Sequence, residues 1–171
     1  MTKTICLLIA AALLAASAAA STDPFLGRWT LNLRRSKYPA GACPKRMVIE
    51  MNSVERGIHY RSETTYANGN TLRAEYTADY DGKPTIVLGS RGMLLPVSLK
   101  RIDSHTVIAS YTKSSEVVAT SRRVVSGDGR LMTITTTSKD QSGKNATAVG
   151  VYEKDTGSQL DLRPARSGNG K

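Results

Sequence analysis

Apolar and polar side chains alternate with a period of two along most of the chain, from Gly27 to Lys154. Within residues 71–80, the positions of one parity carry apolar or small side chains, namely Leu72, Ala74, Tyr76, Ala78 and Tyr80. Residues 57–66 repeat this pattern. A period of two is the repeat of a β-strand with one buried face, whereas helical spacing would scatter these positions around a cylinder. The pattern therefore predicts an all-β domain.

Turn-forming residues interrupt the alternation at regular intervals. Asn68-Gly69 and Asp81-Gly82 are pairs that favour tight hairpins. We predict ten strands, at residues 27–33, 46–54, 57–66, 71–80, 84–88, 94–102, 105–113, 116–125, 130–139 and 146–154. Short connections make successive strands antiparallel, and about ten strands with one apolar face close most economically into an up-and-down meander β-barrel. The long connection 34–44 holds two prolines and a glycine, so no helix is predicted there.

The first 20 residues have the features of an export signal. Lys3 supplies the positive start, an apolar run follows, and residues 18–20 are small alanines suited to cleavage. A signal this short and alanine-rich is typical of bacteria, so we expect a periplasmic or secreted protein. We divide the chain into a signal peptide (1–20), a barrel domain (21–155) and a basic tail (156–171) that we expect to be disordered. We expect no transmembrane span in the mature chain, because the apolar run is short and is removed.

Two segments resemble the calycin proteins, which comprise the lipocalins and the fatty-acid-binding proteins. Residues 25–31 read Phe-Leu-Gly-Arg-Trp-Thr-Leu, which is similar to the F-x-G-x-W-x-L opening of that superfamily, and residues 151–154 are similar to the closing strand of fatty-acid-binding proteins. The opening also resembles that of uncharacterised exported bacterial lipocalin-like proteins. The resemblance implies a barrel with an interior and a Trp29 that plugs one end. The chain departs from fatty-acid-binding proteins at Gly150, where they carry an arginine, and in lacking a helical lid.

The predicted inward face carries six of the seven tyrosines. They are Tyr60, Tyr66, Tyr76, Tyr80, Tyr111 and Tyr152, and their neighbours of the same parity are often alanine, serine or glycine. A barrel wider than eight strands leaves interior space, and apolar walls with a few hydroxyls are usual for a small-molecule pocket. The alternative is that the tyrosines fill a solid core and send their hydroxyls to the rim.

Arg123 shares the parity of the predicted inward face. A buried guanidinium needs partners, and an anionic ligand could supply one. The alternative is that Arg123 reaches solvent near the end of its strand or packs over Trp29. A one-residue slip in register would turn Arg122 inward instead.

The residues of the common catalytic and metal sites are missing. The two histidines, His59 and His105, have no cysteine or carboxylate nearby at ligand spacing, and no phosphate-binding or nucleophile motif is present. Glu63 and Glu75 fall on the charged face beside arginines, which indicates surface ion pairing. We therefore predict no enzyme, no metal and no cofactor.

The formal net charge of +10 indicates anionic partners. Nucleic acid is not expected, because the tyrosines lie on the face opposite the basic residues and the chain carries an export signal. An outer-membrane barrel would need a large apolar outer face and aromatic girdles, which the sequence lacks. We therefore predict an exported, non-enzymatic barrel that carries a small apolar or amphipathic ligand. The alternative is a structural or interaction module with a filled core that contacts anionic envelope surfaces through its basic exterior.

Overall fold

The computed structural model describes residues 22–139 and 142–156. The predicted signal peptide and almost all of the predicted tail lie outside these residues. Ten strands make up the domain: β1 (Gly27–Leu31), β2 (Arg46–Ser53), β3 (Gly57–Thr65), β4 (Thr71–Asp79), β5 (Asp81–Gly89), β6 (Gly92–Asp103), β7 (Thr106–Lys113), β8 (Glu116–Val125), β9 (Leu131–Lys139) and β10 (Asn145–Lys154). A single 3₁₀ turn, η1 (Leu33–Arg35), follows β1 in the described part of the chain. No helix in that part is long and apolar enough to cross a membrane.

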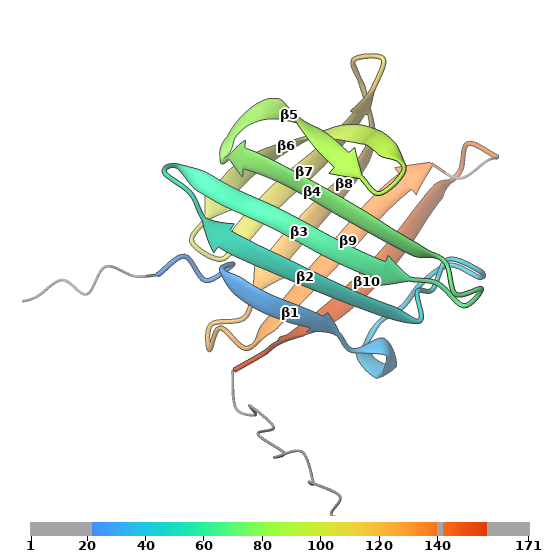
Figure 1. Cartoon of the computed structure of the whole chain (residues 1–171), viewed down its shortest axis with the longest axis horizontal. Helices are drawn as coiled ribbons and strands as arrows, with labels where there is room; N and C mark the ends of the chain where they lie inside the picture. Colours follow the sequence, from blue (N-terminus) through green and yellow to red (C-terminus); the bar gives the residue numbers. More distant parts are fainter. Residues whose placement is uncertain (1–21, 140–141, 157–171) are drawn as a thin grey trace, which may run out of the picture.

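The strands form a closed barrel in which each strand pairs with its neighbour in sequence. All pairs are antiparallel, and β1 closes the barrel against β10, with Leu31 opposite Tyr152. Figure 1 shows β1 to β4 crossing in front of β7 to β10, which are the two walls of the cylinder. The predicted ten-strand antiparallel meander barrel is therefore confirmed.

Three predicted strands, β1, β5 and β6, have an end that is wrong by two or more residues. β1 ends at Leu31 because Asn32 caps the 3₁₀ turn, and its side chain accepts a hydrogen bond from the Arg35 amide. The Asp81-Gly82 pair does not separate two strands, since β5 begins at Asp81 and Gly82 sits at φ +84° within it. β5 and β6 are both longer than predicted and are joined by a turn of only two residues, 90–91.

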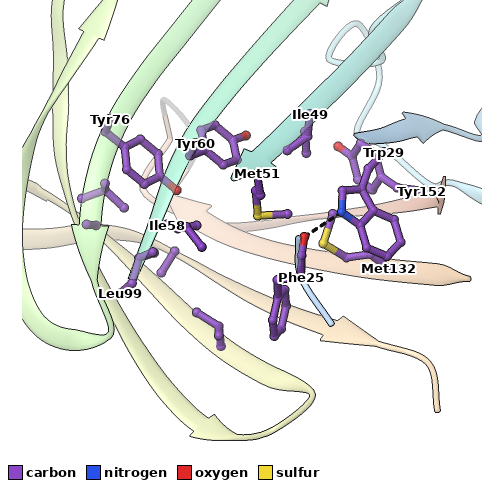
Figure 2. Packing of buried hydrophobic residues seen from close by; sticks show 14 of the residues in the cluster. Phe25, Trp29, Ile49, Met51, Ile58, Tyr60, Tyr76, Leu99, Met132 and Tyr152 are labelled. Atoms are coloured by element: carbon purple, nitrogen blue, oxygen red, sulfur yellow. Dashed lines mark hydrogen bonds between the residues drawn. The ribbon is translucent and has the colours of Figure 1, made fainter. Parts of the chain in front are cut away.

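One end of the barrel is closed by a packed apolar core. Trp29 is fully buried, and its indole Nε1 donates a hydrogen bond of 2.9 Å to the carbonyl oxygen of Phe25. Figure 2 shows Trp29 beside Met132, with Phe25 entering from the segment that precedes β1. Asp23, in the same segment, accepts hydrogen bonds from Arg101 and from Tyr80. The predicted role of Trp29 as an end plug agrees with this packing.

The outer face of β1 to β4 carries charged side chains in pairs. Arg73 lies 2.9 Å from Glu63, and Glu75 contacts both His59 and Arg61, at 2.9 and 3.4 Å. The two glutamates are therefore engaged in surface ion pairs, as the sequence predicts. This alternation of charge fixes which face of each strand looks outward and so orients the tyrosines inward.

Of the neighbouring strands in the barrel wall, β4 and β5 share the fewest register pairs. Register pairs join these strands at only two positions, Ala74 with Gly89 and Glu75 with Leu88. By contrast, β3 and β4 pair over nine positions. The β5–β6 hairpin is therefore held mainly by β7, at one side of the barrel (Figure 1).

Candidate ligand site in the barrel mouth

The end of the barrel opposite Trp29 is open. Several side chains at this end lie on the same alternating strand positions as the buried core residues, so they face inward, yet they are only half-buried. They are Ser62, Ala74, Ala119, Thr136, Ser138, Ala146 and Ala148. A hollow of about 590 Å³ lies between β9, β10 and residues 39–42, and Thr136 and Ala148 are among the residues that line it. Small residues on these strands leave the interior unfilled, so the mouth is hollow while the other end is solid.

Two stacked tyrosines and an arginine lie between the solid end and the mouth. The rings of Tyr60 and Tyr76, which are register partners on β3 and β4, stack with centroids 4.6 Å apart and an interplanar angle of 13°. The guanidinium carbon of Arg123 lies 5.1 Å from the centroid of Tyr60. Figure 2 shows the two rings side by side and facing into the barrel. Arg123 thus points inward, over the face of an aromatic ring that favours a cation.

Arg123 is buried and short of partners. Its side chain is 3% exposed, and its one hydrogen bond among the described residues runs from Nη2 to the Tyr111 hydroxyl at 3.3 Å. Nε, Nη1 and the hydroxyl of Tyr76 make no hydrogen bond of good geometry, although the Tyr76 hydroxyl lies close enough to the guanidinium for Arg123 to affect its pKa. No carboxylate in the described part of the chain forms a salt bridge with Arg123. A guanidinium carries its charge at any ordinary pH, so this is a buried cation that no residue of the barrel neutralises.

On β8, Arg123 is the inward-facing residue one step farther from the mouth than the residues at the level of the hollow. On β8 the inward residue above it is Ser121, whose hydroxyl lies 2.6 Å from that of Thr136. Thr136 in turn lines the hollow in the mouth. A molecule in the mouth therefore has Arg123 and its tyrosines beneath it.

Burial raises the pKa of the tyrosine hydroxyls around Arg123. For Tyr60 and Tyr76, desolvation is the largest cause, and the positive charge of Arg123 partly opposes the rise in pKa. Both phenols are therefore neutral at physiological pH. They offer hydroxyl groups and ring faces to a ligand, and the charge in this region is that of Arg123 alone.

A second tyrosine pair stands against β10. Desolvation is the main cause that raises the pKa of Tyr152, and its hydroxyl donates a hydrogen bond of 3.1 Å to Met47 Sδ. A Cβ atom at Gly150 would lie 2.8 Å from the Tyr152 ring and 2.9 Å from the Tyr38 hydroxyl. The two tyrosines therefore occupy the space that a side chain at Gly150 would need, which explains why this strand carries no arginine there.

The structure brings together some of the predicted site residues and separates others. Tyr60, Tyr76, Tyr111 and Arg123 form one cluster, and Tyr152 packs nearby in the same core. Tyr80 lies at the closed end, where its hydroxyl donates to Asp23, and Tyr66 lies in the turn after β3, outside the core cluster. Arg122 is exposed, and Lys154 rather than Arg123 lies over Trp29, at 5.0 Å.

Sequence reasoning missed Tyr38. This residue packs against the core although it lies in the long connection before β2. The connection is held to β10 by the bridge of Lys37 with Val149, whose backbone amides and carbonyls exchange two bonds of 2.7 Å. The alternation of apolar and polar residues predicts whether a side chain points inward or outward only within a strand. Tyr38 lies outside the strands, so the sequence pattern did not indicate that its side chain enters the core.

Residues 22–139 and 142–156 contain no metal-binding cluster. No group of three His, Cys, Asp or Glu side chains in these ranges could hold a metal ion. His105 contacts Ser104, and His59 is engaged with Glu75 on the outer face.

Comparison with known proteins gives a fold and no family. No protein-family model matches the chain, and no curated protein does. Among solved structures, the zebrafish ileal bile acid-binding protein in complex with cholic acid is similar, with a TM-score of 0.52 and 14% identity over 77% of this chain and 99% of that chain. A Schistosoma mansoni fatty acid binding protein in complex with arachidonic acid has a TM-score of 0.55 and 16% identity over 78% of this chain and 97% of that chain. These similarities confirm the predicted barrel fold.

Proposed function

We propose that this protein is a non-enzymatic carrier that binds one small, mostly apolar molecule in the barrel mouth and holds an anionic group of that molecule near Arg123. The single observation that carries the proposal is the buried guanidinium of Arg123, whose Nε and Nη1 have no partner. A buried charge without compensation is costly, and a carboxylate or sulfonate presents oxygens that match the guanidinium fork.

The shape and chemistry of the mouth support an apolar body for this ligand. The hollow of about 590 Å³ falls within the range of small-molecule pockets, about 300–1,000 Å³. Its strand walls are two alanines, a threonine, a serine and Lys139, and one proline with three small residues borders the other side. The ligands of the two similar structures, cholic acid and arachidonic acid, are both acids with apolar skeletons.

Export belongs to the same proposal. The basis is the sequence of residues 1–20, with a cation before an apolar run and small residues at its end. A carrier outside the cytoplasm would move a poorly dissolving molecule through the periplasm or the medium. The test is fractionation of cells that express the full chain: recovery of a shortened protein outside the cytoplasm supports export, and a full-length cytoplasmic protein contradicts it.

The first binding experiment tests the site in the mouth. Ala148 lines the hollow, and the neighbouring Thr147 points to the outside of the same strand. We expect dodecanoate to bind the unmodified protein in isothermal titration, Ala148→Trp to abolish the heat of binding, and Thr147→Trp to leave it unchanged. Equal binding by both variants would place the ligand elsewhere. An absence of binding to the unmodified protein, together with no co-purified molecule in native mass spectrometry, would favour the interaction module with a filled core.

A second experiment isolates the anionic group. Arg123→Met keeps an apolar chain of similar length but removes the charge, and Arg122→Met is the matched control on the exposed face of β8. We expect Arg123→Met to weaken dodecanoate binding by about 10- to 100-fold, because a charge-assisted hydrogen bond is lost, and to leave dodecanol binding nearly unchanged. Loss of both ligands to the same degree would show that Arg123 shapes the site without holding the anion.

A further inference from the structure

The β5–β6 hairpin carries an apolar stripe on its outer face. Leu88 and Met93 are register partners across the hairpin, and they are 59% and 75% exposed. Ile86 lies two residues before Leu88 on β5 and is 61% exposed, and Leu95 lies two residues after Met93 on β6. The intervening Val87 and Leu94 face the interior instead. Single exposed apolar side chains are common on protein surfaces, but four of them aligned on one short hairpin form a patch. Such a patch indicates an interaction surface.

The stripe stands at the rim of the mouth. The two-residue turn of the hairpin, 90–91, lies at the same end of the barrel as residues 39–42 and the turn between β7 and β8. A hollow of about 860 Å³ separates residues 93–96 from the tip of the β7–β8 hairpin at residues 112–115. In Figure 1 the β5–β6 hairpin forms the upper border of the barrel, beside β4. A surface that touched the stripe would therefore meet the mouth.

Between Gly82 and Ile102 the β5–β6 hairpin carries only basic charges, and the acidic register partner of Leu88 on β4, Glu75, is paired with His59 and Arg61. Arg91 at the tip of the hairpin and Lys113 at the tip of the neighbouring hairpin are both exposed. The acidic residue nearest in sequence to Lys113 is Glu116, its register partner. Apolar side chains flanked by cations complement an interface of anionic headgroups over acyl chains.

We propose that the β5–β6 stripe, Ile86, Leu88, Met93 and Leu95, inserts into an anionic lipid surface and sets the barrel mouth against it. The inference rests on the proposed function in one respect, since it gives the carrier a place to load or release its apolar ligand. A second copy of the chain is a poorer occupant. Four side chains offer a few hundred Å² of apolar surface, below the roughly 800 Å² per partner of a stable interface.

The test is co-sedimentation of the full chain with phosphatidylcholine vesicles that contain or lack about a third phosphatidylglycerol. We expect binding to the anionic vesicles, and binding at least about tenfold weaker for Leu88→Ser/Met93→Ser, because two inserted side chains are lost. The control is Ile102→Ser, which removes a side chain of β6 that is 57% exposed but lies at the closed end. It should bind as the unmodified protein does. All three side chains lie in solvent, so the folded state should survive each change, and circular dichroism checks this.

Insertion has its own signature in fluorescence. Met93→Trp should shift its emission to the blue on addition of anionic vesicles, whereas Ile102→Trp should not, and the buried Trp29 contributes a constant background.

The proposal is overturned if the unmodified protein does not bind the vesicles. It is also overturned if Leu88→Ser/Met93→Ser binds equally well and about 0.5 M salt alone removes the protein, which would indicate diffuse charge attraction. A dimer in solution that Leu88→Ser/Met93→Ser dissociates would assign the stripe to a second copy. No ligand is present in these experiments, so their failure is independent of a failure of ligand binding in the mouth.

Discussion

At the scale of single residues, the interior contains polar groups that the barrel itself does not satisfy. The Tyr76 hydroxyl is buried without a hydrogen-bond partner, two N–H groups of Arg123 are in the same state, and both residues face the same interior space. Buried polar groups are satisfied in most folded proteins, so these two residues together are the observation on which the proposed anion site rests.

Tyr76→Phe tests whether this hydroxyl contributes to folding. Removing a buried hydroxyl that has no partner relieves a desolvation cost, so we expect the free energy of unfolding at neutral pH to stay the same or to rise by about 1 kcal/mol. Tyr80→Phe is the matched control, because its hydroxyl donates a hydrogen bond of 2.9 Å to Asp23. This variant should lose about 1 kcal/mol. Urea denaturation measures both, and a clear loss of stability in Tyr76→Phe would mean that the hydroxyl is satisfied in the folded protein.

The sequence predicted the direction of strand residues better than that of loop residues. Parity alone predicted that Tyr60, Tyr76 and Tyr111 share one face, because a period of two leaves a strand residue only two directions. Parity did not indicate that Arg123 would remain unpaired, since pairing depends on which strands lie opposite. Tyr38 was missed because its segment has no period.

At the scale of elements, the turn residues located the hairpins but not their ends. The predicted strands β3, β4, β8 and β9 fall within a residue of the observed ones. The prediction failed at β5 and β6, where Asp81-Gly82 indicated a turn although the backbone continues as a strand. Register shifts between Asp81 and Pro84 absorb these residues. The same irregular hairpin carries the exposed stripe, so the element that sequence reasoning described least well is the one with the most unusual surface.

The contact between β3 and β4 depends on a glycine. A Cβ atom at Gly57 would lie 2.0 Å from the carbonyl oxygen of Ala78 and 2.7 Å from the Cα of Asp79, both of them backbone atoms. Gly57→Ala should therefore push the two strands apart and lower the free energy of unfolding by about 1–3 kcal/mol. Gly127→Ala is the control, since nothing lies within 4 Å of its Cβ position. It should change stability by less than about 0.5 kcal/mol in urea denaturation. Equal stability of the two variants would contradict the close approach of β3 and β4.

At the scale of the whole molecule, the barrel is divided into a solid half and a hollow half. Large side chains such as Trp29, Met132 and Leu99 fill one end, and alanine, serine and threonine line the other. The sequence predicted both the closure of the barrel and the small residues of its interior face. It left open whether the interior was solid, because this depends on how ten strands tilt and on which ends of the strands meet.

The interior tyrosines make the stability of the whole barrel sensitive to alkaline pH. Burial raises the pKa of five tyrosines above the ordinary value of about 10, namely Tyr38, Tyr60, Tyr76, Tyr80 and Tyr152. Below pH 10 both folded and unfolded chains keep these protons, so the stability is fully present. Above pH 10 the unfolded chain releases protons that the folded chain retains, and unfolding is favoured by about 1.4 kcal/mol per phenol for each pH unit. Five phenols together remove up to about 7 kcal/mol per pH unit, against a total stability of about 5–15 kcal/mol.

We therefore expect cooperative unfolding within a few pH units above 10, in which the absorbance of phenolate and the loss of β-sheet circular dichroism rise together. Tyr76→Phe removes one of the five protons, so the dependence of its unfolding free energy on pH above 10 should be shallower by about a fifth. Urea denaturation at several alkaline pH values gives this slope directly. Gradual ionisation of the tyrosines with an intact circular dichroism spectrum would show that solvent reaches their hydroxyls in the folded barrel, and the hollow would then extend below the mouth to the Tyr60–Tyr76 stack. In that case water would already hydrate Arg123 before a ligand binds. The loss of dodecanoate affinity caused by Arg123→Met would then be correspondingly small.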